Sequence, residues 1–287
     1  MKFILGTATF GARYGIANQN SEMVENECIR VLQNARLLGL ESLDVAPVYG
    51  DAESIIGKFH ETNKNFKVFS KISESAFSSE DKILEQIRKS REKMQITEFE
   101  GISFHNLDLL REMRTREVNQ LISKILSSGL TSTVGVSVYL ESEIDFVKSQ
   151  FPDVSLFQVP ENVMDRRLIN SELISLLSNR GVEFQVRSLF LQGLLLMDNT
   201  SLNGSLASAR QGLSKLKKYS ASRNQSVLDL CLNYANQIDW ASSIVVGAAT
   251  AEQLSEIVNH KKKQIDLETL PDAFPDSITD PRRWTHT

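Results

Sequence analysis

Short apolar segments alternate with longer amphipathic ones along almost the whole chain of 287 residues. The short segments are typical of buried β-strands, and the apolar residues between them recur at helical spacing, as in residues 24–38. Such alternation favours parallel βα units over an antiparallel sheet. The repeats predict a (β/α)8 TIM barrel with its active site at the carboxyl ends of the strands. The expected strands begin near Lys2, Leu40, Phe66, Glu100, Thr133, Val154, Val182 and Ser242.

The sequence shows no sign of a second domain. It has no linker rich in Pro or Gly, no low-complexity block and no break in composition, and barrels of this length are often one domain. We therefore predict that residues 1–287 form a single barrel domain. Within it, residues 265–287 are expected to be a non-helical tail that packs back on the barrel, because the ending at 280–284 is too specific in character for a frayed terminus.

Composition argues against several kinds of partner. A net charge of −4 and an isoelectric point near 5.7 give no basic surface for nucleic acid. No apolar run reaches the length of about 18 residues that a membrane-spanning helix needs. Cys28 and Cys231 lie in helical patterns and are expected to be buried thiols of a reducing compartment. We predict a cytoplasmic protein that binds neither nucleic acid nor membranes and holds no metal ion.

Four polar residues in the first third of the chain lie at or just beyond the ends of expected strands: Asp44, Tyr49, Lys71 and His105. If three successive strands are neighbours in a barrel, these side chains converge at one mouth. A tyrosine beside a lysine is a suitable general acid, because the ammonium stabilises the phenolate and lowers the pKa of the phenol. An aspartate paired with the lysine keeps it charged and in place. Such a group is suited to protonating a carbonyl oxygen.

These residues resemble the active-site signature of the aldo-keto reductase family. The run 44–50, followed by Glu53 and Gly57, is similar to that family's D-x-A-x-x-Y-G…E…G motif, and Lys71 and His105 follow in matching order. One short motif is weak, but the matches continue across all eight expected strands. The further matches are Gly6-Thr7, Gly135-Val136-Ser137, Gln158, Asn162, Ser188, Gly193-Leu194-Leu195, Val246-Gly247 and Glu252-Gln253-Leu254.

The resemblance implies an enzyme in which a nicotinamide cofactor delivers hydride to a carbonyl carbon while Tyr49 protonates the oxygen. Lys71, paired with Asp44, would depress the pKa of Tyr49, and His105 would hydrogen-bond the carbonyl oxygen. NADPH is the expected cofactor, with NADH as the other candidate. The expected cofactor contacts are Gly6, Thr7, Asp44, Ser137, Gln158, Arg187, Ser188, Leu189, Phe190, Gly193, Gly247, Ala248, Thr250, Gln253 and Glu256.

Four positions depart from the family pattern. Val138 stands where Asn usually follows the serine, and Arg187 replaces the aromatic residue that typically stacks on the nicotinamide ring. Arg187 would repel the positively charged oxidised ring and so favour reduced cofactor. The alternative is that it points at an anionic substrate or a phosphate. Gln253 replaces the common arginine for the 2′-phosphate and Ile257 replaces Asn, so the preference for NADPH is expected to be smaller than usual.

The expected substrate is a small carbonyl compound. The resemblance extends to a bacterial subgroup associated with surface-polysaccharide and nonulosonic-acid sugar pathways, and the polar residues near the mouth would suit a polyhydroxylated keto-sugar, neutral or anionic. The alternative is that some of these residues are ion-paired at the rim. The expected substrate contacts are Phe10, Arg13, Tyr14, Asn106, Glu161, Asn162 and Trp284.

Two other functions stay open at this point. The departures at Val138, Arg187 and Ile257 allow a non-catalytic barrel that binds nucleotide as a sensor or as an assembly subunit, although the intact set of four residues favours an enzyme. An unrelated barrel lyase or epimerase would instead use Lys71 as a Schiff base. Nucleotide-dependent turnover of an aldehyde tests the first alternative, and borohydride trapping with a keto-sugar tests the second.

Overall fold

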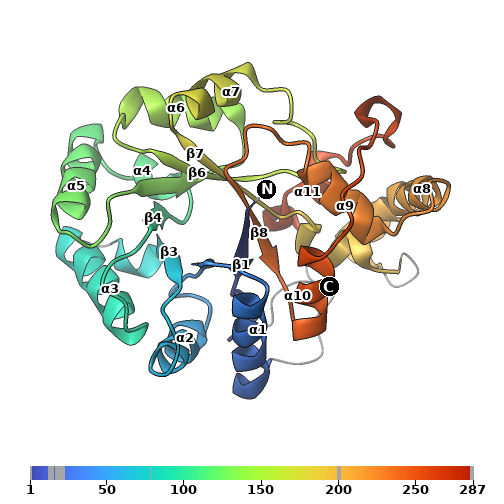
Figure 1. Ribbon diagram of the computed structural model, residues 1–287. Coiled ribbons are helices and arrows are strands. Elements are labelled where there is room, and N and C mark those ends of the chain that lie inside the picture. Colours follow the sequence, from blue (N-terminus) through green and yellow to red (C-terminus); the bar gives the residue numbers. More distant parts are fainter. Residues whose placement is uncertain (1, 12–15, 17–22, 78, 199–201, 285–287) are drawn as a thin grey trace.

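The computed structural model describes residues 2–11, 16, 23–77, 79–198 and 202–284. Eight parallel strands pair in sequence order, and β8 pairs with β1, so the sheet closes into a barrel. The predicted (β/α)8 fold is confirmed, with helices around the outside of the strands (Figure 1). The strands are β1 (Phe3–Gly6), β2 (Ser42–Asp44), β3 (Lys67–Ile72), β4 (Gly101–Phe104), β5 (Val134–Ser137), β6 (Leu156–Pro160), β7 (Glu183–Arg187) and β8 (Ser243–Gly247).

The helices follow the predicted amphipathic segments. Ser79 caps α3 as expected, accepting a hydrogen bond from the backbone N–H of Lys82. The predicted cap of the first helix, Ser21, lies outside the described residues, and α1 begins after Val24. The α-helices are α1 (Glu25–Leu37), α2 (Ala52–His60), α3 (Glu80–Lys93), α4 (Asp108–Arg111), α5 (Thr115–Ser127), α6 (Glu141–Gln150), α7 (Glu172–Asn179), α8 (Ala209–Ala221), α9 (Val227–Ala235), α10 (Ala251–Val258) and α11 (Asp276–Thr279).

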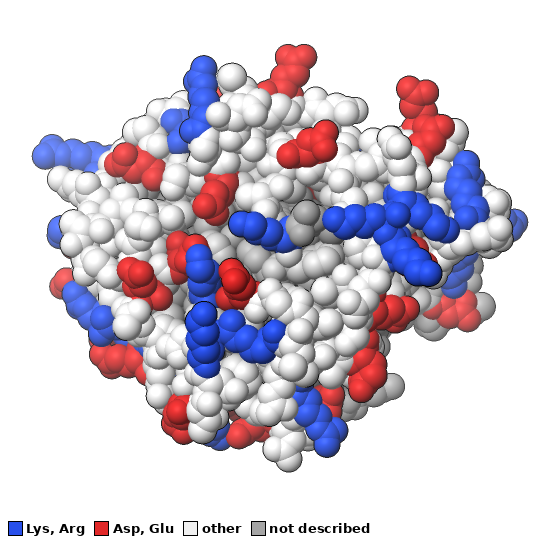
Figure 2. Space-filling model, viewed as in Figure 1, with Lys and Arg blue, Asp and Glu red and all other residues white. Residues whose placement is uncertain are grey.

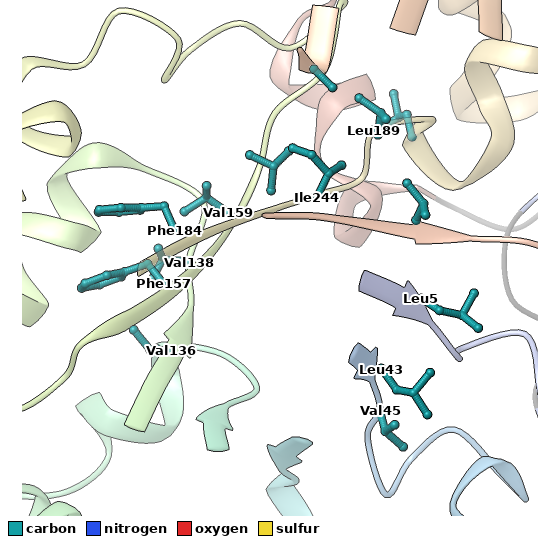
Figure 3. Close-up of a cluster of buried hydrophobic side chains, with 14 of the residues drawn as sticks. Leu5, Leu43, Val45, Val136, Val138, Phe157, Val159, Phe184, Leu189 and Ile244 are labelled. Atoms are coloured by element: carbon teal, nitrogen blue, oxygen red, sulfur yellow. The ribbon is translucent and has the colours of Figure 1, made fainter. Parts of the chain in front are cut away.

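The main core lies between the outer face of the barrel and the helices. Strand residues such as Leu5, Leu43 and Ile244 are fully buried there (Figure 3). Phe157 and Phe184, from the neighbouring strands β6 and β7, stack with their ring centroids 5.4 Å apart. Cys28 and Cys231 are buried free thiols, as predicted.

The inside of the barrel changes from apolar to polar along its axis. Successive strand residues face opposite sides of the sheet, so residues two apart share the interior. Ile4, Phe69 and Leu156 form a separate apolar cluster in the barrel. Two positions further along β3 and β6, the interior residues are Lys71 and Gln158. The strands therefore present polar groups to the interior only towards their carboxyl ends.

The carboxyl-terminal tail contacts the loop that follows β6. The backbone N–H of Phe274 donates to the carbonyl of Met164 at 2.8 Å, and Ile278 and Trp284 are buried. The prediction of a tail without helix is wrong, because α11 is a single α-helical turn and two 3-10 turns, η6 (Leu267–Thr269) and η7 (Pro281–Arg283), flank it. One turn is too short to produce a periodic apolar pattern.

Candidate active site

The centre of the candidate site is a buried ion pair between two strands. Lys71 Nζ on β3 donates to both carboxylate oxygens of Asp44 at the end of β2, at 2.6 Å each. Gln158 Nε2 on β6 donates to Asp44 Oδ1 at 2.8 Å and to Gln185 Oε1 at 3.3 Å. Three strands therefore fix the carboxylate, and the two charges offset each other.

Tyr49 reaches this pair from the loop between β2 and α2. Lys71 Nζ lies 5.5 Å from the centroid of the Tyr49 ring. The next residue, Gly50, has a φ of +55°, and a Cβ atom there would lie 1.9 Å from the carbonyl oxygen of Gly11. Only glycine fits this close crossing of two loops. Gly50 in the signature therefore fixes the path of the loop that presents Tyr49.

Gly57 and Glu53 of the signature serve packing. A Cβ atom on Gly57 would lie 2.1 Å from the carbonyl oxygen of Lys93, so α2 can approach the end of α3 only with glycine there. Glu53 is buried, and one of its oxygens lies 3.6 Å from Lys93 Nζ. Glu53 and Gly57 of the motif thus position α2, whereas Asp44 and Tyr49 supply polar groups of the site.

The protonation states suit a proton donor. Burial raises the pKa of Tyr49, and the adjacent Lys71 lowers it by less, so the phenol stays protonated at neutral pH. The prediction of a depressed pKa is therefore wrong in direction, although the effect of Lys71 itself has the expected sign. Burial lowers the pKa of Lys71, but Asp44 and Tyr49 together more than offset this effect, so the pKa is raised and the amine stays charged. A charged amine is not a Schiff-base nucleophile.

His105 follows β4 and is the fourth member of the group. Its backbone N–H donates to the carbonyl of Ile72 at 3.3 Å, which ties it to the end of β3. Burial lowers the pKa of His105, and the positive charge of Lys71 lowers it further. The imidazole is therefore neutral at pH 7 and can donate one N–H bond to an oxygen acceptor.

A pocket of about 390 Å³ opens above this group. Asp44 and Tyr49 lie at one part of its lining, and Gln253 and Glu256 of α10 lie at another. The volume is in the range of small-molecule and cofactor sites. Twelve of the fifteen residues expected to contact cofactor line it, namely Gly6, Asp44, Gln158, Arg187, Ser188, Leu189, Phe190, Gly193, Gly247, Ala248, Gln253 and Glu256.

The other three expected cofactor contacts are not in the lining of the pocket. The Thr7 hydroxyl is fully buried and donates to the backbone carbonyl of Asp44 at 3.0 Å. Ser137 is buried, and its hydroxyl accepts from Arg187 Nε at 3.3 Å. The Thr250 hydroxyl caps α10 by accepting from the N–H of Gln253 at 3.2 Å. Each of these hydroxyls keeps further hydrogen-bonding capacity, so their contact with cofactor stays a prediction.

The loop that follows β7 turns sharply along the pocket. Ser188, Leu191 and Gln192 have φ angles of 60°, 47° and 53°, and Gly193 follows with 88°. Left-handed conformations of non-glycine residues cost energy and cluster at functional sites. Successive backbone N–H groups in such turns form concave surfaces that suit anions. This loop therefore suits an anionic group such as the pyrophosphate of a dinucleotide.

The expected substrate contacts are mostly not at the pocket, and none of those in the described ranges lines it. Phe10 belongs to the hydrophobic core. Glu161 is fully buried and accepts hydrogen bonds from the Tyr234 hydroxyl and from the N–H of Leu168 at 3.0 Å. The prediction that Phe10 and Glu161 lie at the pocket is wrong, because Phe10 packs in the core and Glu161 is buried in hydrogen bonds within the protein. Arg13 and Tyr14 lie outside the described residues.

The remaining expected substrate contacts hold the chain in place. Asn162 is fully buried and donates to the carbonyl of Ser188 at 3.1 Å, which ties the ends of β6 and β7 together. Asn106 donates to Glu74 at 2.8 Å. Trp284 donates from its indole to the carbonyl of Ile278 at 3.0 Å and anchors the tail. Burial corrects Asn162 and Trp284 to supporting residues, whereas contact of the half-buried Asn106 with substrate stays a prediction.

Several pocket residues were missed by sequence reasoning. Ala8 and Thr9 come directly after β1, so their place beyond a strand end was a usable signal. Leu228 comes from α9, and nothing in the local sequence indicates that it reaches the pocket. Tyr139 also escaped notice, although two guanidinium groups contact its ring. The other missed lining residues are Gln192, Leu196, Val245 and Ala249.

The fold and the polar group at the barrel mouth define an oxidoreductase-type barrel, and comparison with known proteins gives its family. The sequence model of the Aldo/keto reductase family matches residues 2–272. The chain belongs to this family, and membership implies NAD(P)H-dependent carbonyl reduction. A comparison with the curated proteins found no match.

Solved structures share the fold at low sequence identity. The chain is similar to a glycerol dehydrogenase from Gluconobacter oxydans, with a TM-score of 0.70, 18% identity and coverage of 93% of this chain and 88% of that one. It is also similar to a thermostable aldo-keto reductase in complex with the inhibitor epalrestat, with a TM-score of 0.71, 18% identity and coverage of 93% and 91%.

The described part of the chain contains neither a membrane-spanning helix nor a cluster of metal-binding side chains. None of its helices is both long enough and apolar enough to cross a membrane. Nor does it bring together three or more His, Cys, Asp or Glu side chains in a way that could hold a metal ion. On the face seen in Figure 2, positive and negative side chains are interspersed.

Proposed function

We propose that this protein reduces an aldehyde or ketone to an alcohol with NADPH, and that Tyr49 is the general acid. The observation that carries the proposal is the buried Asp44–Lys71 pair, with both N–O distances at 2.6 Å, beside Tyr49 in the lining of one pocket. The bound nicotinamide supplies the hydride. The protein supplies the proton, because the raised pKa of Tyr49 keeps the phenol protonated at neutral pH.

Each of the other polar groups has a separate task in this scheme. Lys71 stabilises the phenolate that forms when Tyr49 gives up its proton, and its own raised pKa keeps it charged throughout. Asp44 and Gln158 hold Lys71 in place through a connected set of hydrogen bonds. His105 is neutral, so it can donate a hydrogen bond to the carbonyl oxygen without adding a charge.

The residues along the pocket fit a dinucleotide. The left-handed turn at 188–193 supplies the anion-binding backbone. The start of α10 lines another part of the pocket, so its dipole favours a phosphate there. Gln253 Oε1 already accepts from the N–H of Ala249 at 2.9 Å, which leaves its amide N–H groups for a ligand. Because Gln253 can still donate to a 2′-phosphate but no arginine stands at 253, we propose that NADPH is preferred over NADH by a small margin.

Arg187 is proposed to favour the reduced cofactor. Its guanidinium lines the same pocket as Tyr49 and carries its positive charge near the hydride-transfer end. A cationic oxidised nicotinamide is repelled there, and the neutral reduced ring is not. We expect NADPH to bind more tightly than NADP⁺, and Arg187→Met to tighten NADP⁺ alone. Fluorescence titration of both redox states checks this, and equal affinities would contradict the role of Arg187.

The keto-sugar substrate remains a proposal that rests on resemblance to a sugar-pathway subgroup. Two of its supporting residues, Glu161 and Asn162, have their side chains occupied inside the protein. The polar character of the pocket comes instead from Arg187, Gln158 and Gln192. A hydroxylated carbonyl compound still finds hydrogen-bonding partners in that set, and a role in carbohydrate biosynthesis is proposed on this basis.

The test of the proposed function is cofactor-dependent turnover by the purified protein. Aldehydes and ketones of increasing polarity are offered with NADPH or NADH, and loss of the reduced nicotinamide is followed together with formation of the alcohol. We expect one alcohol formed for each nicotinamide oxidised, with NADPH the better cofactor. Tight binding of dinucleotide with no turnover of any carbonyl compound would support the non-catalytic alternative instead.

A further inference from the structure

Arg187 is the only Lys or Arg side chain among the described residues that line the pocket. The other cation near the carbonyl position is Lys71, and Asp44 neutralises it through two hydrogen bonds of 2.6 Å. The remaining ionised lining residue, Glu256, belongs to α10. The part of the pocket beside Tyr49 therefore carries one positive charge that the Asp44–Lys71 pair does not balance.

The guanidinium of Arg187 is held by neutral groups. Nε donates to the Ser137 hydroxyl at 3.3 Å, and Nη1 donates to the Ser188 hydroxyl at 3.2 Å. The same guanidinium lies 4.4 Å from the centroid of the Tyr139 ring. Within the described ranges no carboxylate forms an ion pair with Arg187, and its Nη2 makes no hydrogen bond. Its position is thus fixed while its charge and at least two donors stay available.

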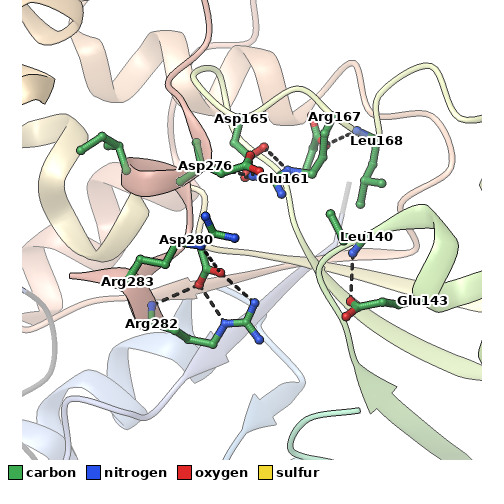
Figure 4. Close-up of polar contacts among 12 residues, drawn as sticks. Leu140, Glu143, Glu161, Asp165, Arg167, Leu168, Asp276, Asp280, Arg282 and Arg283 are labelled. Carbon is green, nitrogen blue, oxygen red and sulfur yellow. Dashed lines mark hydrogen bonds and ion pairs between the residues drawn. The ribbon is translucent and has the colours of Figure 1, made fainter. Parts of the chain in front are cut away.

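A second guanidinium shows the contrast. Arg282, in the tail, lies 3.7 Å from the centroid of the same Tyr139 ring. Its charge is balanced by Asp280, which accepts from Arg282 Nε at 2.8 Å and from Nη2 at 2.7 Å (Figure 4). The tail therefore contacts Tyr139 with an arginine that already has a carboxylate partner, which it shares with Arg283 at 3.5 Å. Of the two cations on this ring, only Arg187 is left for a ligand.

We propose that Arg187 recognises an oxyanion, a carboxylate or a phosphate, on the substrate that Tyr49 protonates. This inference rests on the proposed reductase function and names the substrate class. A guanidinium presents its donors in a planar fork that matches two oxygens of such a group. In a partly enclosed pocket the attraction is screened less than it is at an open surface. Substrates that bear an oxyanion close to the aldehyde or ketone should therefore be selected over neutral analogues.

The test compares matched pairs of aldehydes. Succinic semialdehyde is set against butanal for the carboxylate, and glyceraldehyde 3-phosphate against glyceraldehyde for the phosphate. For wild type we expect kcat/KM to be about ten- to a hundredfold higher for the anionic member of at least one pair, as a charge-assisted contact provides. Arg187→Met should abolish that preference by lowering kcat/KM for the anionic aldehydes far more than for the neutral ones, while the Kd of NADPH stays close to that of wild type. Arg187→Lys should restore part of it.

The matched control is Arg180→Met. Arg180 is exposed and lies just before the other end of β7, so the variant changes the net charge equally while leaving the pocket intact. It should behave as wild type towards all four aldehydes.

Three outcomes would overturn the inference. The first is a wild type that reduces neutral and anionic members equally well. The second is an Arg187→Met variant that keeps the anionic preference. The third is a variant that weakens NADPH binding and slows both members alike, which would assign Arg187 to a cofactor phosphate. In each case the neutral aldehydes are still reduced, so the proposed function survives; absence of turnover with every aldehyde would reject the function itself.

Discussion

The side chain of Lys71 has two partners with different consequences. Its contact with Asp44 is a buried ion pair, and its proximity to Tyr49 affects only the chemistry. Removing one member of a buried pair leaves an uncompensated charge, whereas replacing the pair as a whole is much less costly. We therefore expect a change at Lys71 to affect both stability and activity. A change at Tyr49 should affect mainly activity.

Lys71→Met should lower the free energy of unfolding by about 3–5 kcal/mol and abolish turnover, because Asp44 is left in the barrel without its cation. Lys67→Met is the matched control: Lys67 is on the same strand and pairs with Glu100 at 3.1 Å, but its side chain is 56% exposed. That variant should lose no more than about 1 kcal/mol. Urea unfolding measures both, and equal stability of Lys71→Met and wild type would contradict the pairing.

Sequence reasoning at this scale predicted that the proposed catalytic residues converge, but it misjudged their surroundings. Asp44, Lys71 and His105 could be predicted to converge because they end neighbouring strands. The direction of the pKa shift of Tyr49 could not, because it depends on burial by residues from several loops. Glu161 was wrongly expected at the pocket, because its hydrogen-bond partner, Tyr234, is 73 residues away in the chain and could not be predicted from the local sequence.

The contact between the end of β6 and α9 includes a buried titratable group, the carboxyl of Glu161. Glu161 directly follows β6, and the hydroxyl of Tyr234 on α9 donates to it. Burial raises the pKa of Glu161 to about 8 from an ordinary value of 4.5. The folded protein therefore holds a proton that the unfolded chain has already released at neutral pH. Stability falls as pH rises between these two values.

We expect wild type to lose on the order of 1–3 kcal/mol of unfolding free energy between about pH 5 and pH 8 through this group. Glu161→Gln carries no titrating carboxyl, so its stability should change less across that range. Glu172→Gln, at an exposed position in the first turn of α7, is the control and should follow wild type. Parallel pH profiles for the wild type and Glu161→Gln would show that Glu161 is not the titrating group.

We propose that residues at the start of α10 set the relative affinity for NADPH and NADH. Gln253→Arg adds a charge-assisted contact to a 2′-phosphate, a gain of about 1.5–3 kcal/mol when well formed. We expect NADPH to bind roughly ten- to a hundredfold more tightly and NADH to bind as before. Gln253→Met removes the hydrogen bond from the N–H of Ala249 without adding charge, and so controls for loss of that bond. Calorimetric titration measures all three proteins, and a clear preference of the wild type for NADH would contradict the cofactor proposal.

For the molecule as a whole, periodicity was sufficient to predict the barrel. Each strand begins one or two residues after its expected start, because alternation of apolar strands and amphipathic helices is a local property. The tail was harder, since its contacts join residues far apart in sequence, as with Phe274 and Met164. Tyr139 and Arg282 meet in the same way, across about half the chain. Contacts of this kind leave no periodic trace in the sequence.

The central claim is that Tyr49 donates the proton during carbonyl reduction, and Tyr49→Phe tests it most directly. The variant keeps the ring in the pocket and removes only the hydroxyl. Single-turnover oxidation of bound NADPH by an aldehyde should slow by about a hundred- to ten-thousandfold, while the Kd of NADPH and the free energy of unfolding stay close to wild type. A Tyr49→Phe protein that oxidises NADPH at nearly the wild-type rate would contradict the account.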